Sequence, residues 1–382
     1  MSKKLLKSLV ITFVIVPHTL FFVKTCVSGW IPMVRRTTQD LARVWGSSDN
    51  DVFAVGRNGT ILHYDGGSWS PMTSGTTELL YGVWGSSYYD VFAVGSNGTI
   101  LHYDGGSWSP MTSGTTESLS GIWGSLANDV FAVGSNGTIL HYSGGGWFSM
   151  TSGTTESLYG VWGSSGNDVF AVGNGGTVLH YNGHDWTAMS SETTEYLQGI
   201  GGNSGGNVFV TGTHGTVIHY NGFNWTPMNS RTIEHLPGLW SSIGGDVFAV
   251  GRSGTIVYYN GNPQNRWVRM NSWTTRDLNA VWGNSERDVF AVGDNGTILY
   301  YDGISFVCLL GQIYDEHSQE IGFLRYIRDN VLIQTPEGKE IIRLYYQWSP
   351  VLVQAMAEDE ELKEEVREMI DGILGLIEEE TE

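Results

Sequence analysis

A repeat of 39 residues dominates the sequence and restricts the folds that this chain can adopt. The segment from Asp51 to Tyr64 reads Asp-Val-Phe-Ala-Val-Gly-Arg-Asn-Gly-Thr-Ile-Leu-His-Tyr, and Asp-Gly-Gly-Ser-Trp follows it. A fixed internal period indicates an array of one structural unit. The chain therefore has to be built from copies of one small motif, which begin at Asp51, Asp90, Asp129, Asp168, Asn207, Asp246 and Asp288.

Each repeat contains four short apolar stretches of strand length, bounded by Gly, Asn, Asp or Ser. No helical period appears inside the unit, so four β-strands are expected. In four of the copies an Asn-Gly dipeptide joins the second stretch to the third. This dipeptide favours positive φ at both residues and predicts a type I′ turn. The four dipeptides are Asn58-Gly59, Asn97-Gly98, Asn136-Gly137 and Asn295-Gly296.

Four strands in about 40 residues are typical of one blade of a β-propeller. The predicted fold class is mainly β: a seven-bladed β-propeller over residues 30–306, with an open β-solenoid as the structural alternative. Gly201 replaces the first-strand Trp in one copy, so we expect the weakest seam between blades there. The first-strand Trp residues of the other copies are Trp45, Trp84, Trp123, Trp162, Trp240 and Trp282.

The ends of the array predict how the ring closes. Trp30 lies 15 residues before Trp45, the same spacing as from Trp69 to Trp84, so the segment at Trp30 reads as a fourth strand without a blade of its own. We expect it to complete the blade over 278–303 and to join the two ends of the ring. Closure leaves only short edges unpaired. Phe306 is the competing candidate, because it lies where a fourth-strand Trp would be.

The repeat resembles bacterial propellers of the broad BNR/Asp-box and assembly-factor type through its core Gly-Thr-Ile-Leu-His-Tyr-Asp-Gly-Gly-Ser-Trp. The Asp-box places one more residue between the glycines and the Trp than this chain does. The sialidase arginine cluster and nucleophilic Tyr have no counterpart, and WD-repeat and kelch signatures are absent. The resemblance therefore implies the propeller architecture and no particular activity.

Residues 308–357 resemble the C-terminal domain called the CFI-box, with Cys308-Leu-Leu-Gly in place of the expected Cys-Phe-Ile. Apolar residues at helical spacing, with acids elsewhere, predict a small all-α domain over 307–382. This segment is expected to pack on itself or to self-associate. The residues that carry the resemblance are Cys308, Phe323–Asp329, Leu332, Gly338, Arg343–Tyr346 and Ser349-Pro350.

Residues 1–29 read as a signal peptide or an uncleaved signal anchor. Lys3, Lys4 and Lys7 precede an apolar run that is shorter than a spanning helix needs. A lipoprotein anchor at Cys26 is the alternative that we weigh against both. The expected location is secreted, periplasmic or associated with the cell envelope, with membrane contact only through this segment if it stays uncleaved.

Composition excludes some partners and cofactors. A net charge of −19 repels phosphate backbones, so no nucleic-acid partner is expected. The second strands begin with an Asp that we expect to accept N–H bonds from the turn. No metal or other cofactor is predicted, because the repeated His residues occupy equivalent places on a ring and cannot converge on one ion. These are His63, His102, His141, His180 and His219.

The candidate binding residues lie where the copies differ. Most loops that lead from a fourth strand to the next first strand end in Glu, at Glu78, Glu117, Glu156, Glu195 and Glu234. The loops and turns near the closure carry cations and a Trp instead. These residues would form one sector on the face with the Asn-Gly turns, suited to an anionic glycan or an acidic protein segment. They are Arg35, Arg36, Arg57, Arg231, Arg252, Trp273 and Arg276.

The sequence thus favours an exported, non-catalytic binding scaffold that recognises a glycan or a protein partner through one loop face. Nearly interchangeable blades suit repeated weak contacts. The alternative is a glycan hydrolase or lyase on the same fold, which would need a carboxylate pair near the axis. We assign no catalytic residue. A third class, an assembly factor for membrane complexes, rests on fold analogy.

Overall fold

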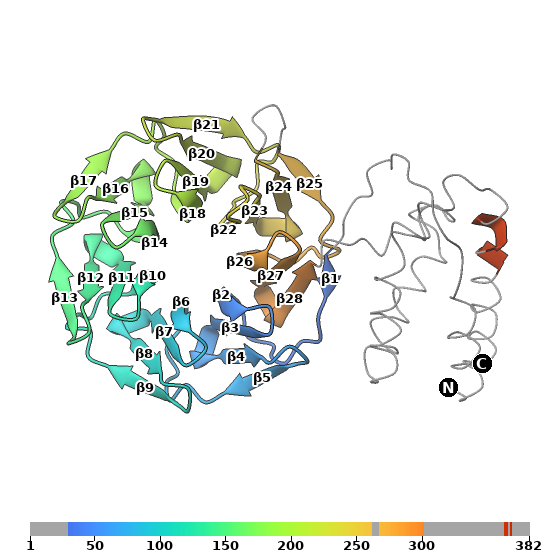
Figure 1. Ribbon diagram of the computed structural model, residues 1–382, viewed down its shortest axis with the longest axis horizontal. Helices are drawn as coiled ribbons and strands as arrows, with labels where there is room; N and C mark the ends of the chain where they lie inside the picture. Colours follow the sequence, from blue (N-terminus) through green and yellow to red (C-terminus); the bar gives the residue numbers. More distant parts are fainter. Residues whose placement is uncertain (1–29, 262–266, 302–362, 366, 369–382) are drawn as a thin grey trace. The chain divides into compact units, whose positions relative to one another are not determined.

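The computed structural model describes residues 30–261, 267–301, 363–365 and 367–368. The chain between Ser28 and Ser305 belongs to one compact unit. Its described residues form seven four-stranded antiparallel sheets around a central axis, which confirms the seven-bladed propeller (Figure 1). The repeated pattern of a short strand followed by a Gly-containing turn thus gives one blade per copy.

Each blade runs outward from the axis in chain order, except the last. The strands of blades 1 to 3 are β2 Leu41–Ser48, β3 Asp51–Gly56, β4 Ile61–Tyr64 and β5 Trp69–Met72; β6 Leu80–Ser87, β7 Asp90–Gly95, β8 Ile100–Tyr103 and β9 Trp108–Met111; β10 Leu119–Leu126, β11 Asp129–Gly134, β12 Ile139–Tyr142 and β13 Trp147–Met150. Those of blades 4 to 6 are β14 Leu158–Ser165, β15 Asp168–Gly173, β16 Val178–Tyr181 and β17 Trp186–Met189; β18 Leu197–Ser204, β19 Asn207–Gly212, β20 Thr216–Tyr220 and β21 Trp225–Asn229; β22 Gly238–Ser241, β23 Val247–Val250, β24 Ile256–Tyr259 and β25 Val268–Met270.

Blade 7 closes the ring with a strand from the beginning of the chain. It consists of β26 Leu278–Ser285, β27 Asp288–Gly293, β28 Thr297–Tyr301 and, on its outer edge, β1 Ile31–Pro32. In register, Ile31 lies opposite Tyr300. The predicted closure by the segment at Trp30 is therefore confirmed, while Phe306 lies outside the described residues.

Trp30 makes the same contact as the fourth-strand Trp of other blades. Its ring meets Phe248 of blade 6 edge-on at 5.9 Å, as Trp108 of blade 2 meets Phe53 of blade 1 at 6.1 Å. Trp30 is only 1% exposed. Each such edge-to-face pair fills the seam between two sheets with large apolar side chains.

The Asn-Gly turns have the predicted positive φ at both residues. Asn58 and Gly59 have φ of 52° and 62°, and the Thr60 N–H donates to the Arg57 carbonyl. The equivalent turns are labelled η1 Arg57–Gly59, η2 Ser96–Gly98, η3 Ser135–Gly137, η4 Asn174–Gly176, η5 Thr213–Gly215, η6 Arg252–Gly254 and η7 Asp294–Gly296.

The first-strand Trp residues interlock with glycines around the axis. A Cβ added to Gly85 would lie 2.6 Å from the Trp45 ring of the previous blade, and one added to Gly124 would lie 2.6 Å from the Trp84 ring. The series breaks once: blade 5 has Gly201 instead of Trp, and blade 6 has Ser241 where the other blades have Gly. At the seam between blades 5 and 6, the missing Trp ring of blade 5 thus coincides with the added Ser241 side chain of blade 6.

Outside the propeller, the described residues 363–365 and 367–368 are helical and lie within the all-α segment predicted over 307–382. The predicted leader over 1–29, with Cys26, lies outside the described residues. So does the remainder of the predicted helical domain over 307–382, with Cys308. In the part of the chain that is described, no helix has the length and apolar character needed to cross a membrane.

Candidate functional site

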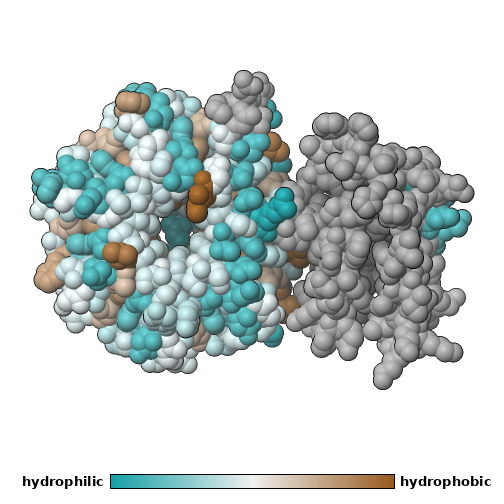
Figure 2. Space-filling model, viewed as in Figure 1, coloured by the Kyte–Doolittle hydropathy of each residue, from teal (hydrophilic) through white to brown (hydrophobic). Residues whose placement is uncertain are grey.

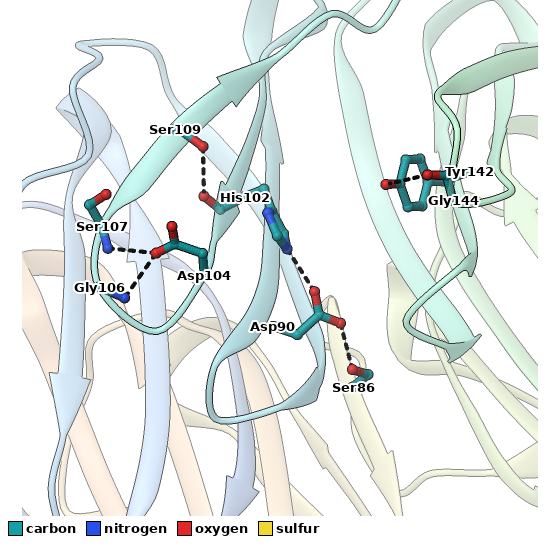
Figure 3. Close-up of polar contacts among 9 residues, drawn as sticks. All are labelled: Ser86, Asp90, His102, Asp104, Gly106, Ser107, Ser109, Tyr142 and Gly144. Carbon is teal, nitrogen blue, oxygen red and sulfur yellow. Dashed lines mark hydrogen bonds and ion pairs between the residues drawn. The ribbon is translucent and has the colours of Figure 1, made fainter.

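The repeated Asp and His residues form one polar relay per blade. In blade 2, His102 Nε2 lies 2.6 Å from Asp90 Oδ1, and the Ser86 hydroxyl donates to the other carboxylate oxygen at 2.5 Å (Figure 3). The His102 ring also lies 4.6 Å from the ring of Phe92. The relay ties the second and third strands of the blade to the end of its first strand.

The relay is a structural element, because its order is wrong for nucleophilic catalysis. The carboxylate stands between the hydroxyl and the imidazole, so the Ser oxygen lies beside a weakly basic carboxylate and not beside the imidazole that activates it in a Ser-His-Asp triad. This also corrects one expectation: Asp90 accepts bonds from Ser86 and His102 side chains rather than from turn N–H groups. An Asp that does accept from turn N–H groups is Asp104 in the following Asp-Gly-Gly-Ser segment, where the N–H groups of Gly106 and Ser107 donate to its carboxylate (Figure 3).

Blade 5 carries a neutral version of this relay. His219 Nε2 lies 2.6 Å from Asn207 Oδ1, and the Asn207 amide donates to Asn203. Burial lowers the pKa of His219 below its usual value. Below about pH 6.5 the unfolded chain therefore binds a proton that the folded blade resists, and stability falls as the pH is lowered.

The double variant Asn203→Ser/Asn207→Asp should reduce this acid sensitivity, because it rebuilds the Ser-Asp-His relay of blades 1 to 4. A carboxylate beside the imidazole favours the protonated ring. We expect the variant to gain on the order of 1 kcal/mol over the wild type between pH 7.5 and pH 5. Denaturant unfolding at both pH values measures this, with Asn224→Asp as a control that adds the same charge on an exposed turn. An identical pH dependence in wild type and double variant would contradict it.

The loops between blades and the Asn-Gly turns share one face, as the sequence predicted. The Gly59 N–H donates to the Glu78 carbonyl, and the Asn97 amide donates to the Glu78 carboxylate at 3.0 Å. Glu117 accepts an equivalent bond from Asn136. The repeated Glu residues therefore connect neighbouring blades. We call this side of the propeller the turn face.

Three of the seven candidate binding residues line one groove on the turn face. Arg35, Trp273 and Arg276 border a groove of about 730 Å³ over blade 7, with Met33 on its wall. Neither Arg35 nor Arg276 forms an ion pair with any described carboxylate. Each donates one long hydrogen bond of 3.5 Å, from Arg35 to the Asn295 carbonyl and from Arg276 to the Thr297 hydroxyl. We call this space the closure groove.

The other four candidates do not join the closure groove. Arg57 is paired with Asp40 at 2.8 Å and Arg252 lies 4.0 Å from Asp277, so the charge of both is partly neutralised. Arg36 lines a separate groove of about 710 Å³ over blade 1. Arg231 is exposed in the loop between blades 5 and 6. The predicted binding residues thus lie on one face of the propeller, but their cations do not form a single site.

An equivalent groove over blade 3 has a different lining. It measures about 840 Å³, and Gly114 and Ser152 stand where the closure groove has Trp273 and Arg35. Trp273 has φ of 55°, in the left-handed region that Gly114 occupies at 75°. A bulky residue in this backbone region costs conformational energy, and such residues cluster at binding sites. The conformation of Trp273 therefore favours a functional role for its side chain.

Sequence reasoning missed Arg43, which lies in the central channel. Its side chain lines both the inner channel, a cavity of about 270 Å³, and the channel mouth on the turn face, of about 490 Å³. Figure 2 shows the hollow at the centre of the ring. The signal was present in the alignment of the copies: the position of Arg43 is Gly or Ala in the other blades, at Gly82, Gly121, Gly160, Gly199, Gly238 and Ala280.

Burial lowers the pKa of Arg43 to about 10, so its guanidinium is still charged at neutral pH. The same mouth contains Tyr159 and Tyr196, whose rings stack at 4.3 Å. Burial, followed by a hydrogen bond with Tyr159, raises the pKa of Tyr196. Tyr196 therefore remains a neutral hydroxyl. Among the described residues there is no group of three or more His, Cys, Asp or Glu side chains that could hold a metal ion.

No protein-family model and no curated protein matches this sequence. The resemblance of the repeats to BNR/Asp-box propellers and of the tail to the CFI-box therefore stays a prediction.

Solved structures with the same fold do match. YCF48 from Cyanidioschyzon merolae is 19% identical, with a TM-score of 0.61 over 72% of this chain and 99% of that one. YCF48 bound to D1 peptide is 19% identical, with a TM-score of 0.59 over 71% of this chain and 94% of that one. The WD40 β-propeller domain of Doa1 is 14% identical, with a TM-score of 0.60 over 72% of this chain and 97% of that one. At these identities the likeness shows the fold alone.

Proposed function

We propose that this propeller is a non-catalytic scaffold that binds an acidic segment of a partner protein in the closure groove. The observation that carries the proposal is the joint position of Arg35, Trp273 and Arg276 in one groove. No carboxylate of a described residue borders that groove, while the repeated loops elsewhere on the face end in Glu. Guanidinium groups with unused donors favour carboxylates, and a Trp ring offers an apolar contact beside them.

The comparisons support a protein partner in general terms. A propeller of the same fold, YCF48, has been solved with D1 peptide bound. That finding concerns YCF48, and it makes a peptide the first class of ligand to test here.

The variant Trp273→Gly/Arg276→Glu tests the groove directly, because it installs the residues that the blade 3 groove has at Gly114 and Glu117. We expect binding to immobilised acidic peptides to fall at least tenfold. Stability should stay the same or rise by about 1 kcal/mol, because Gly removes the cost of the left-handed backbone at Trp273. Lost binding with retained stability thus separates recognition from folding.

The matched control is Arg287→Glu, which makes the same charge reversal on the exposed turn between β26 and β27 and should leave binding unchanged. Equal peptide binding by the wild type and the groove variant would refute the closure groove. A wild type that binds acidic glycans and no peptide would replace the protein partner with a carbohydrate.

We also propose that the protein acts outside the cytoplasm, on the basis of Lys3, Lys4 and Lys7 before a short apolar run. Mass spectrometry of the first residue of the mature chain, together with its cellular fraction, tests this. A chain found intact in the cytoplasm would contradict it.

A further inference from the structure

Arg43 lies on the first strand of blade 1 and lines the central channel. The first strands approach so closely there that a Cβ added to Gly160 would lie 2.4 Å from the Gln198 carbonyl oxygen, and one added to Gly121 would lie 2.8 Å from that of Tyr159. Arg43 places a long charged side chain at this level, from blade 1 alone. It extends across the channel toward blades 6 and 7.

The guanidinium of Arg43 is held loosely. Its Nη1 donates to the carbonyl oxygens of Pro237 and Asn279, both at 3.5 Å, the long limit of a hydrogen bond. Guanidinium carries five N–H donors, and no described residue accepts from Nε or Nη2. No described carboxylate forms an ion pair with it either. Arg43 is half-buried, and a partly desolvated cation without an ion-pair partner is costly.

The acids at the same mouth already have partners. Asp40 is paired with Arg57 at 2.8 Å, and Asp294 accepts a bond from the Asn279 amide at 3.0 Å. Asp294 keeps its negative charge, because its partner is a neutral amide. Arg43 is the one cation at the mouth that forms no ion pair with a described carboxylate.

The remaining lining of the mouth is neutral. The Tyr159 hydroxyl donates to Asn174 at 3.3 Å and Tyr196 is hydrogen-bonded to Tyr159, which leaves Tyr81 as the available tyrosine donor among the described residues.

We propose that the channel mouth is a carboxylate-binding site in which the fork of Arg43 takes both oxygens of the ligand and the Tyr81 hydroxyl donates to it. An Arg–carboxylate pair is commonly bidentate and charge-assisted, and Nε with Nη2 provides the two parallel donors. The mouth, of about 490 Å³, admits a single carboxylate-bearing group rather than a folded domain. The site is separate from the closure groove and does not depend on it.

The test is calorimetric titration of the whole chain with N-acetyl-glycylglycine and with its C-terminal amide. We expect saturable binding of the carboxylate and at least tenfold weaker binding of the amide. Arg43→Gly, which installs the residue of the other blades, should reduce carboxylate binding at least tenfold and keep the propeller folded. Arg287→Glu, which reverses a charge on the exposed turn between β26 and β27, should leave the affinity unchanged.

N-acetyl-aspartyl amide distinguishes the two sources of the ligand group. Tighter binding of this side-chain carboxylate assigns the mouth to an internal acidic residue of a partner, and tighter binding of the free terminus assigns it to a chain end. Equal binding by Arg43→Gly, equal binding of the amide, absence of saturable binding, or tighter binding of inorganic phosphate would each overturn the proposal.

Discussion

Replacing Trp30 with Ala is expected to destabilise the propeller by about 3–5 kcal/mol, the cost of removing a large aromatic side chain from a core. Trp30 is buried at the seam between blades 6 and 7, where its ring also lies 5.5 Å from that of Tyr301. It is the one described residue of the leading segment that fills this seam with an aromatic ring. Loss of it should loosen the strand that closes the ring.

Denaturant unfolding of Trp30→Ala and Trp30→Phe measures the effect, and the Phe variant should recover part of the loss. Phe223→Ala is the control, since Phe223 is 91% exposed and its removal should change stability by less than about 0.5 kcal/mol. A Trp30→Ala midpoint equal to the wild-type midpoint would show that the seam does not depend on the closing strand.

Gly85→Ala is expected to destabilise the fold by about 1–3 kcal/mol through overpacking. The added methyl would lie 2.6 Å from the Trp45 ring and 2.8 Å from the Asp90 carbonyl oxygen, and the backbone atom cannot move cheaply. Because part of the clash is with Trp45, the cost should be smaller in a Trp45→Ala background. A coupling of roughly 0.5–3 kcal/mol is typical of residues in direct contact.

The control for this cycle is Gly145→Ala, where an added Cβ meets nothing within 4 Å and φ is not in the left-handed region. The Gly145→Ala substitution should leave the free energy of unfolding nearly unchanged. Additive losses for Gly85→Ala and Trp45→Ala would mean that ring and glycine do not constrain each other across the seam.

The blade count, the closing strand and the shared face of loops and turns could be predicted because a period fixes them. Trp30 has the same spacing to Trp45 as Trp69 has to Trp84, and the structure gives Trp30 the corresponding contact. The likeness to the WD40 domain of Doa1, despite the absence of WD signatures, shows that the blade geometry does not require them.

The binding residues were harder to predict, because they depend on contacts between neighbouring copies. Arg57 looked like an available cation until the structure placed Asp40 at 2.8 Å. Arg43 escaped attention because it interrupts a column of small residues inside the channel rather than a loop. A position-by-position comparison of the first strands would have found it.

The contact between Trp30 and Tyr301 has a topological consequence. The two ends of the ring meet within blade 7, so a short peptide linker from the end of β28 to Trp30 could join them without moving a blade. New termini could then be opened between blades 5 and 6, where Gly201 and Ser241 interrupt the series of interlocked rings. Such a circular permutant would keep all seven sheets. Its chain ends would lie at the seam that lacks a first-strand tryptophan instead of at the junction closed by β1.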